Sequence, residues 1–357
     1  MGSREICFMT ASAPTTLPAA LYRNDPAQWD AERRAIFARS WQFMGHESSL
    51  PDTGSWIADT LAGYPIVVVR DKDGALRGYH NVCRHRAGPL TDGPSGKCDG
   101  LLVCRYHGWA YTLDGRLRLA RDFGPSSDFD PREYGLFPVR VESWRGLIFV
   151  AIDADVGRLD EAVAPLEARL KGRDWTDLEV ALVRNHPIAA NWKTYVENYL
   201  EGYHVPSIHP SLDAEIIAER YTVTMDGLVA LHEVPMRTPD PVYGGLWAWL
   251  WPNLGVNVYA TGLMMERMSP TGPGSCRLDY IYLMPKGAGV SVETLAMSDV
   301  VTAEDVEIAE TVQRNLDAGV YEVGRLSPRH EGAVAAFQGF VRQALAAGEQ
   351  EALRAAS

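Results

Sequence analysis

The sequence predicts an α+β protein in which a small all-β domain precedes a larger domain that combines an antiparallel sheet with helices. Short β-branched runs separated by Asp-Gly pairs crowd residues 41–152. Longer strand patterns recur between residues 178 and 284, and amphipathic helical patterns flank them on both sides. We therefore expect a helical arm over residues 1–40, an all-β domain over residues 41–152, and a catalytic domain over residues 153–357 on which the arm packs.

The composition narrows the class of protein. The 357 residues are 46% hydrophobic and 22% charged, a balance typical of globular proteins. The formal net charge of −12 argues against nucleic acid or an anionic membrane surface as the main partner. No apolar run approaches the length of a membrane span, and the first twenty residues lack a secretory signal, so we expect a cytoplasmic location.

The first half of the chain reads as an arm followed by hairpins. Trp29, Ile36 and Phe37 recur at helical spacing and predict a helix within residues 15–40. Asp73-Gly74 and Asp114-Gly115 are turn signals. The strands expected around them cover residues 65–70, 76–81, 101–111, 117–119 and 139–152.

The second half alternates helices with the strands of one antiparallel sheet. Helices are expected over residues 159–170, 191–203, 302–318 and 337–347. Strands are expected over residues 178–188, 221–232, 247–259, 263–269 and 276–284.

Two histidines five residues apart mark a candidate metal site at residues 191–210. Glu197 and Glu201 lie four apart on the helix that precedes His204, and Pro210 directly follows His209. Proline interrupts a helix, so His209 should lie on an irregular segment that returns beside His204. Two imidazoles and one carboxylate form the facial set that binds non-haem Fe(II) with open positions. Histidine pairs at this spacing also occur by chance, but carboxylates crowded onto a buried aromatic face need a partner such as a metal.

A second constellation lies within the all-β domain. Its thiol and imidazole groups belong to Cys83, His85, Cys104 and His107. Five cysteines, an odd number, favour metal ligation over a disulfide framework. A structural zinc site would use the same ligand types. However, each half offers one thiolate and one imidazole, and each is followed by a Gly-containing tight turn, at Gly88-Pro89 and Gly108-Trp109. This pattern favours a Rieske [2Fe–2S] cluster over zinc.

The two motifs together resemble those of one family, the catalytic α subunits of Rieske non-haem iron ring-hydroxylating oxygenases. The resemblance rests on C-R-H-R-A-G-P-L at residues 83–90, C-R-Y-H-G-W-A-Y at residues 104–111, and N-W-K-x-x-x-E-N-x-x-E-G-Y-H-x-x-x-x-H from residue 191. Arg105 and Ala87 depart from the common proline and glycine, and neither is a ligand. The resemblance implies a helix-grip, START-like catalytic domain and a cluster held by Cys83, His85, Cys104 and His107.

The resemblance also implies a third iron ligand on a C-terminal helix, besides His204 and His209. Asp305 is the best match, and Asp299 is the reserve candidate. An alternative is that Thr302-x-x-Asp305 forms a capping box, in which the acid only complements the helix dipole.

Glu201 takes the place of the family's bridging carboxylate. The resemblance implies a head-to-tail homotrimer in which the cluster of one subunit faces the iron of the next, with Glu201 bonded to histidines on both sides. A purely structural buried acid is the alternative. Asn198 is a further candidate for the catalytic site, and Tyr203 for the pocket, although core packing explains Tyr203 equally well.

The implied reaction takes electrons from NAD(P)H through a separate flavin and iron–sulfur reductase and uses O₂ at Fe(II) to oxygenate a small molecule. Motif details most resemble the choline, betaine, stachydrine and carnitine oxygenases. Trp247, Trp249 and Trp251 alternate onto one strand face and could bind a cation or a flat ring, or simply form sheet core. Hydroxylation, cis-dihydroxylation or O-demethylation of an aromatic acid, and a Rieske electron carrier without oxygenase activity, remain as alternatives.

Overall fold

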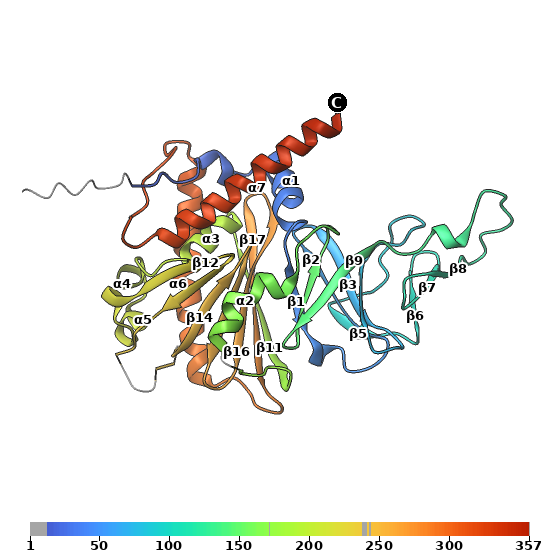
Figure 1. The fold of residues 1–357 in the computed structure, drawn as a ribbon, viewed down its shortest axis with the longest axis horizontal. Helices are drawn as coiled ribbons and strands as arrows, with labels where there is room; N and C mark the ends of the chain where they lie inside the picture. Colours follow the sequence, from blue (N-terminus) through green and yellow to red (C-terminus); the bar gives the residue numbers. More distant parts are fainter. Residues whose placement is uncertain (1–12, 171, 238–240, 243, 357) are drawn as a thin grey trace, which may run out of the picture.

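The computed structural model describes residues 13–170, 172–237, 241–242 and 244–356, so the first twelve residues of the predicted arm lie outside it. A sheet-rich half comes first in the chain, and a half in which helices cover a broad antiparallel sheet follows (Figure 1). The predicted α+β class is thereby confirmed. None of the helices in these ranges combines the length and the apolar character that crossing a membrane requires.

The arm is divided into short pieces rather than forming one continuous helix. These pieces are η1 (Ala19–Tyr22), α1 (Pro26–Glu32) and η2 (Arg33–Phe37). The break falls before Asp25, whose side chain caps α1 by accepting the N–H of Ala27 at 2.8 Å. Pro26 then opens α1, where its missing N–H leaves no bond unmade.

A buried ion pair attaches the arm to α3 (Trp192–Tyr199). Glu32 is 1% exposed and accepts from Lys193 Nζ at 2.5 Å and from Trp192 Nε1 at 2.7 Å. The rings of Phe37 and Trp192 meet edge to face at 4.9 Å. Because breaking a buried pair strands a charge, these contacts hold the arm against the helix that leads into the candidate iron site.

Two antiparallel sheets form the first half. The larger has the strand order β1-β10-β9-β4-β3-β2-β5 and the smaller β6-β7-β8. Their bounds are β1 (Gln42–His46), β2 (Ser55–Leu61), β3 (Tyr64–Arg70), β4 (Leu76–His80), β5 (Ser95–Lys97), β6 (Leu101–Val103), β7 (Ala110–Thr112), β8 (Leu117–Leu119), β9 (Pro138–Trp144) and β10 (Leu147–Ala151). Short 3₁₀ turns η3 (Glu47–Ser49) and η4 (Pro131–Glu133) interrupt the loops.

Both predicted turns are present, and the second packs the smaller sheet against the larger one. Gly74 and Gly115 adopt φ of 80° and 86°, the left-handed region that glycine tolerates. A Cβ on Gly115 would lie 2.5 Å from the ring of Tyr79, whose hydroxyl donates to Leu113 O at 3.0 Å. The second hairpin is therefore packed directly onto β4.

The second half contains one antiparallel sheet with the order β11-β17-β16-β15-β14-β13-β12. Its strands are β11 (Leu178–Ile188), β12 (Thr222–Asp226), β13 (Val229–Glu233), β14 (Gly245–Leu250), β15 (Leu254–Tyr259), β16 (Leu263–Gly272) and β17 (Ser275–Pro285). The strands predicted over residues 221–232 and 247–259 are each a hairpin instead of one strand. Gly227, with φ of 58°, turns the first, and Pro252, which has no N–H for a ladder, lies in the second turn.

The two faces of this sheet pack against different hydrophobic cores. Met264 belongs to the core under α3, while its neighbour Met265 belongs to the core under α2 (Leu159–Leu170). This alternation is the period of a strand. The candidate iron site lies on the α3 face, and the first half of the chain packs on the other (Figure 1).

The remaining helices are α4 (Val205–Ile208), α5 (Pro210–Glu215), η5 (Ala218–Arg220), α6 (Val292–Asp317) and α7 (Gly332–Ala356). Of these helices, α6 and α7 are longer than predicted, and α4, α5 and η5 were not predicted. The helix predicted to reach residue 203 ends at Tyr199, because the Glu201 carboxylate accepts the N–H groups of Tyr203 and His204, the latter at 3.1 Å. The helix predicted from residue 302 begins at Val292, where Ser291 accepts the N–H of Thr294 at 3.1 Å.

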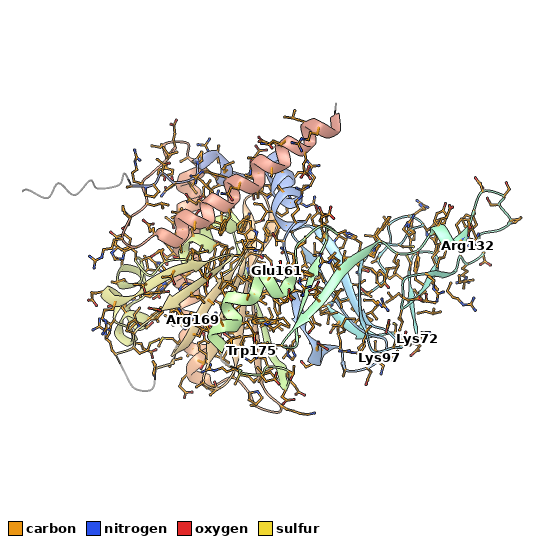
Figure 2. All side chains as sticks on the ribbon, in the orientation of Figure 1. Lys72, Lys97, Arg132, Glu161, Arg169 and Trp175 are labelled. Atoms are coloured by element: carbon orange, nitrogen blue, oxygen red, sulfur yellow. The ribbon has the colours of Figure 1, made fainter. Side chains whose placement is uncertain are left out.

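Buried side chains help to join the halves at two places. Trp175, labelled in Figure 2, is 3% exposed and meets Trp144 of β9 edge to face at 5.3 Å. Arg267 of β16 donates to Phe43 O of β1 and to Asp279 Oδ2 of β17, both at 2.8 Å, and also pairs with Asp59 of β2. A buried cation thus connects strands from both large sheets.

Candidate metal centres and active-site cavity

Three side chains converge beneath α3. One ligand atom from each of His204, His209 and Asp305 lies within 4.8 Å of the others. Asp305 Oδ1 is 3.0 Å from His209 Nε2 and 3.9 Å from His204 Nε2. Two imidazoles and one carboxylate on one side of a point form a set that could hold Fe(II) with positions left open.

The local sequence explains why the histidines meet. His204 precedes α4, and His209 lies between α4 and α5 in a non-helical conformation with φ of −117° and ψ of 76°. Pro210 was expected only to end a helix, but it is also the first residue of α5. The centroids of the two imidazole rings are consequently 5.1 Å apart. The segment that carries His209 therefore returns beside His204, as predicted.

Asp305 lies in the middle of α6, so the capping-box interpretation of residues 302–305 is wrong. Thr302 is 2% exposed and its hydroxyl bonds that of Tyr280 at 2.9 Å. One turn earlier, Ser298 bonds the hydroxyl of Tyr282 at 3.0 Å. These bonds fix α6 on the sheet. Asp299 instead forms an ion pair with Arg184, away from the histidines.

Each histidine has a carboxylate behind it. Glu201 Oε1 lies 2.6 Å from His204 Nδ1, and Glu304 Oε2 lies 2.8 Å from His209 Nδ1. Such carboxylates fix the ring tautomer, so that Nε2 is directed to the metal. Sequence reasoning missed Glu304, although its place beside Asp305 on α6 was a usable signal.

Asn198 and the surrounding charges complete the site. Asn198 Nδ2 donates to Asp305 Oδ1 at 2.5 Å, which makes Asn198 a positioning residue. Burial works against a positive charge on His209, yet Asp305 and then Glu304 raise its pKa above the usual value. The carboxylates around the two imidazoles carry an excess of negative charge that a divalent cation would offset. The residues therefore fit a metal.

The cluster candidates gather on two loops of the first half. Cys83 and Cys104 are 2% and 1% exposed, and the rings of His85 and His107 lie 4.6 Å apart. Among the side chains that the structure describes, His85 Nδ1 is one of the buried polar atoms without a partner. An unpaired nitrogen beside buried thiols fits a site whose metal cluster would complete the bonding.

The loop backbones confirm the expected tight turns. The N–H of Cys83 bonds Gly88 O and that of Cys104 bonds Trp109 O, each at 2.8 Å. A Cβ on Gly88 would lie 2.9 Å from Cys104 Sγ, so only glycine leaves this space free. Ala87, which replaces the family's common glycine, adopts a left-handed φ of 56°.

A cavity of about 100 Å³ opens directly onto the three converging side chains. Sheet residues form its floor, and residues of α3, of α6 and of the segment around α4 and α5 form its walls. Its lining includes Tyr195, Asn198, Tyr199, Glu201, His204, Val205, His209, Tyr221, His232, Trp247, Asn257, Tyr259, Met264, Glu266, Tyr280 and Asp305.

Two titratable groups of this cavity were missed by sequence reasoning. Burial raises the pKa of Glu266 to about 8, and the charge of Asp305 adds to the increase. Burial lowers the pKa of His232 to about 3, so this imidazole is neutral; its Nδ1 lies 2.8 Å from the hydroxyl of Tyr221. Neither residue belongs to a motif, and only the strand register brings them to the cavity.

The three strand tryptophans divide between the two expected roles, a cavity wall and sheet core. Trp247 lines the cavity, but Trp249 is fully buried against Phe337, with ring centroids 5.7 Å apart, and belongs to the core. Trp251 lies beyond the end of β14, where its Nε1 donates to Ser40 Oγ at 2.9 Å. Tyr203 is 59% exposed and stacks on His330, because α3 ends before it.

Comparisons with known proteins agree with this geometry. The Rieske [2Fe-2S] domain model matches residues 40–131, and the ring hydroxylating alpha subunit (catalytic domain) model matches residues 168–347. The chain is 30% identical over 326 residues to a chloroplastic choline monooxygenase of Beta vulgaris. The alignment covers 86% of this chain and 72% of the relative. It is 31% identical over 323 residues to the carnitine monooxygenase oxygenase subunit of Escherichia coli (strain K12), covering 86% and 85% of the two chains.

Solved structures show the same architecture. The structure of a quaternary ammonium Rieske monooxygenase, 27% identical, superposes with a TM-score of 0.84 and covers 93% of this chain and 96% of its own. The family matches and the relatives confirm the predicted resemblance, a Rieske [2Fe–2S] cluster with a mononuclear iron as cofactors, and an enzyme rather than an electron carrier. The chain belongs to the Rieske non-haem iron oxygenases, as a ring-hydroxylating alpha subunit.

Proposed function

We propose that this oxygenase acts on an N-methyl quaternary ammonium compound, at an N-methyl group or an adjacent carbon, so that a C–N bond breaks after hydroxylation. The observation that carries this proposal is the cavity that opens onto His204, His209 and Asp305 and is lined by aromatic rings and carboxylates. Both features suit a cation. The named relatives act on choline and carnitine, and a further one on glycine betaine.

We assign the mononuclear iron to His204, His209 and Asp305, and the cluster to Cys83, His85, Cys104 and His107. When bound, the cluster supplies electrons and the mononuclear iron activates O₂. Glu201 and Glu304 hold the imidazoles in the tautomer that presents Nε2. Asn198 orients the Asp305 carboxylate by donating to Oδ1. A separate reductase that uses NAD(P)H is the proposed electron source.

A head-to-tail homotrimer is the proposed assembly. The cluster loops lie next to β6 and β7, and the iron residues lie next to α4. These two regions are at opposite ends of the folded molecule (Figure 1). The rim of the cluster site is open and partly apolar: Tyr106 is 55% and Val103 is 47% exposed. Inter-subunit electron transfer is described for the similar quaternary ammonium monooxygenase. We assign Glu201, which accepts from His204, to the subunit boundary.

A single-turnover reaction tests the proposed substrate class. Chemically reduced holoenzyme is mixed with O₂ and a pool of choline, glycine betaine, carnitine and aromatic acids, and products are identified by mass spectrometry. We expect a product that has lost a methyl group with release of formaldehyde, or a product cleaved at the adjacent carbon. A ring hydroxyl or cis-diol on an aromatic acid, with the cations unchanged, would contradict the proposal and favour the aromatic alternative.

A further inference from the structure

One carboxyl group on the cavity floor has no role in the metal sites. Glu266 lies on β16, on the same sheet face as Met264, and is 5% exposed. The strand register places it opposite Gly255 of β15 and Tyr280 of β17. It therefore faces the helices and the cavity, while the next residue, Arg267, faces the first half of the chain.

The partners of Glu266 are neutral. Asn257 Nδ2 donates to its Oε2 at 3.3 Å, and the neutral hydroxyls of Tyr195 and Tyr280 act to lower the pKa of the same carboxyl. Within the ranges that the structure describes, no lysine or arginine lines the cavity and none pairs with Glu266. A buried carboxylate without a counter-charge is costly, and burial accordingly raises its pKa to about 8.

The surroundings of Glu266 favour a cation over a proton donor. Aromatic rings that share the cavity belong to Tyr199, Trp247, Tyr259 and Tyr280. Ring faces attract cations that have few or no N–H groups, and a quaternary ammonium has none. Asp305 lies near enough for its charge to affect Glu266, so a nitrogen held by Glu266 is also close to the candidate iron site.

We infer that Glu266 is the counter-charge for the quaternary nitrogen of the substrate and that it selects cationic substrates over neutral ones of the same shape. The inference rests on the proposed function and adds the residue that recognises the charge. A structural role, in which Glu266 only holds the Asn257 amide that also accepts from the Tyr199 hydroxyl at 2.9 Å, is the competing explanation. If Glu266 is the counter-charge, ligand affinity depends on the charge of the ligand; if its role is structural, ligand affinity does not.

Ligand pairs of equal shape separate these roles. Choline is paired with 3,3-dimethylbutan-1-ol, and glycine betaine with 3,3-dimethylbutanoate; in each pair a carbon replaces the charged nitrogen. Dissociation constants are measured by calorimetry on anaerobic holoenzyme for the wild type, Glu266→Gln and Glu266→Asp. Glu197→Gln is the matched control, because Glu197 is a buried carboxyl that does not line this cavity. Iron content and the cluster absorption spectrum show that each variant is intact.

We expect the wild type to prefer the cation of at least one pair by about tenfold or more. Glu266→Gln should reduce this ratio to near one, Glu266→Asp should keep part of it, and Glu197→Gln should leave it unchanged. A ratio that survives in an intact Glu266→Gln variant would overturn the inference, and continued demethylation of the cation by that variant would leave the proposed function standing. If the wild type binds and oxygenates only uncharged or anionic compounds, both proposals fail.

Discussion

Each histidine of the candidate iron site is backed by its own carboxylate, and the two carboxylates differ in their surroundings. Glu304 lies on α6 beside Asp305, and its one partner among the residues that the structure describes is His209, at 2.8 Å. Glu201 lies in the loop after α3, where it also accepts the N–H of His204 at 3.1 Å. Glu201 lines the iron cavity and a second cavity on the other side of α3.

If Glu201 has the proposed bridging role, Glu201→Gln should keep both metal centres and slow turnover by about tenfold to a hundredfold, because the amide lacks the charge that the bridge to His204 and a cluster histidine requires. Steady-state turnover and the rate of cluster oxidation after mixing with O₂ and substrate measure the effect. Glu304→Gln is the matched control and should weaken iron retention without slowing electron transfer in molecules that keep their iron. Equal cluster oxidation rates in Glu201→Gln and the wild type would remove the bridging role.

Glu197 makes stability depend on pH. It accepts from the hydroxyl of Tyr22 and from Gln338 Nε2 at 2.9 Å, and burial raises its pKa from 4.5 to about 7 against these bonds. The folded state therefore binds the proton more tightly than the unfolded state, and stability present below pH 4.5 is lost as the pH rises to about 7. The expected loss is roughly 3 kcal/mol.

Glu197→Gln should remove this loss, since the amide oxygen still accepts both hydrogen bonds. The Tm of the variant should match that of the wild type near pH 5 and exceed it at pH 8. Thermal melts at both pH values check this expectation. A Tm difference that does not change with pH would show that Glu197 stays ionised in the folded protein.

At the scale of elements, the junction between the two halves depends on Arg267 of β16. Replacing it with leucine should destabilise the protein by about 3 kcal/mol, because Asp59 and Asp279 lose the fully buried one of their two arginine partners and keep the more exposed Arg277. Thermal unfolding measures the loss. The double variant Arg267→Leu, Asp279→Asn should recover part of it. If the double variant is no more stable than the single one, the ion pairs do not contribute as inferred.

Much of the element order was predictable because strand and helix periods are local. The range 159–170 for α2 and 178–188 for β11 agree with the structure, since each has a clear period and flanking turn residues. The start of α6 was missed because the buried face of its first half carries polar residues. Ser298 and Thr302 lie on that face and bond the sheet residues Tyr282 and Tyr280. Tertiary contacts overrode the local signal there.

The candidate site was predictable only where motifs carry it. His204 and His209 are five residues apart, so their meeting needed only a local turn. Glu266, Asn257 and His232 come from separate strands, and their approach depends on sheet register. The places of the strand tryptophans were unpredictable for a related reason, because they depend on tertiary contacts. Phe337 of α7 covers Trp249, whereas Trp247 lines the cavity.

At the scale of the molecule, the two candidate metal centres of one subunit lie at opposite ends of its fold (Figure 1). Mixed oligomers of an Asp305→Ala chain and a Cys104→Ser chain test the proposed head-to-tail arrangement. Each variant alone should be inactive, one lacking mononuclear iron and the other the cluster. Oligomers carrying both, isolated through two different tags, should recover activity, because an intact cluster then faces an intact iron site. Inactive mixed oligomers with the expected metal content would contradict the arrangement.

The bond between Tyr280 and Thr302 links the choice of substrate to the retention of metal. Tyr280 forms part of the cavity floor, and its hydroxyl also anchors α6 one turn before Asp305. A smaller side chain at position 280 would widen the cavity and release the helix that carries the third ligand at the same time. Variants with a broader substrate range are thus easier to obtain at Met264, an apolar side chain that lines the cavity and has no hydrogen-bond donor with which to hold α6.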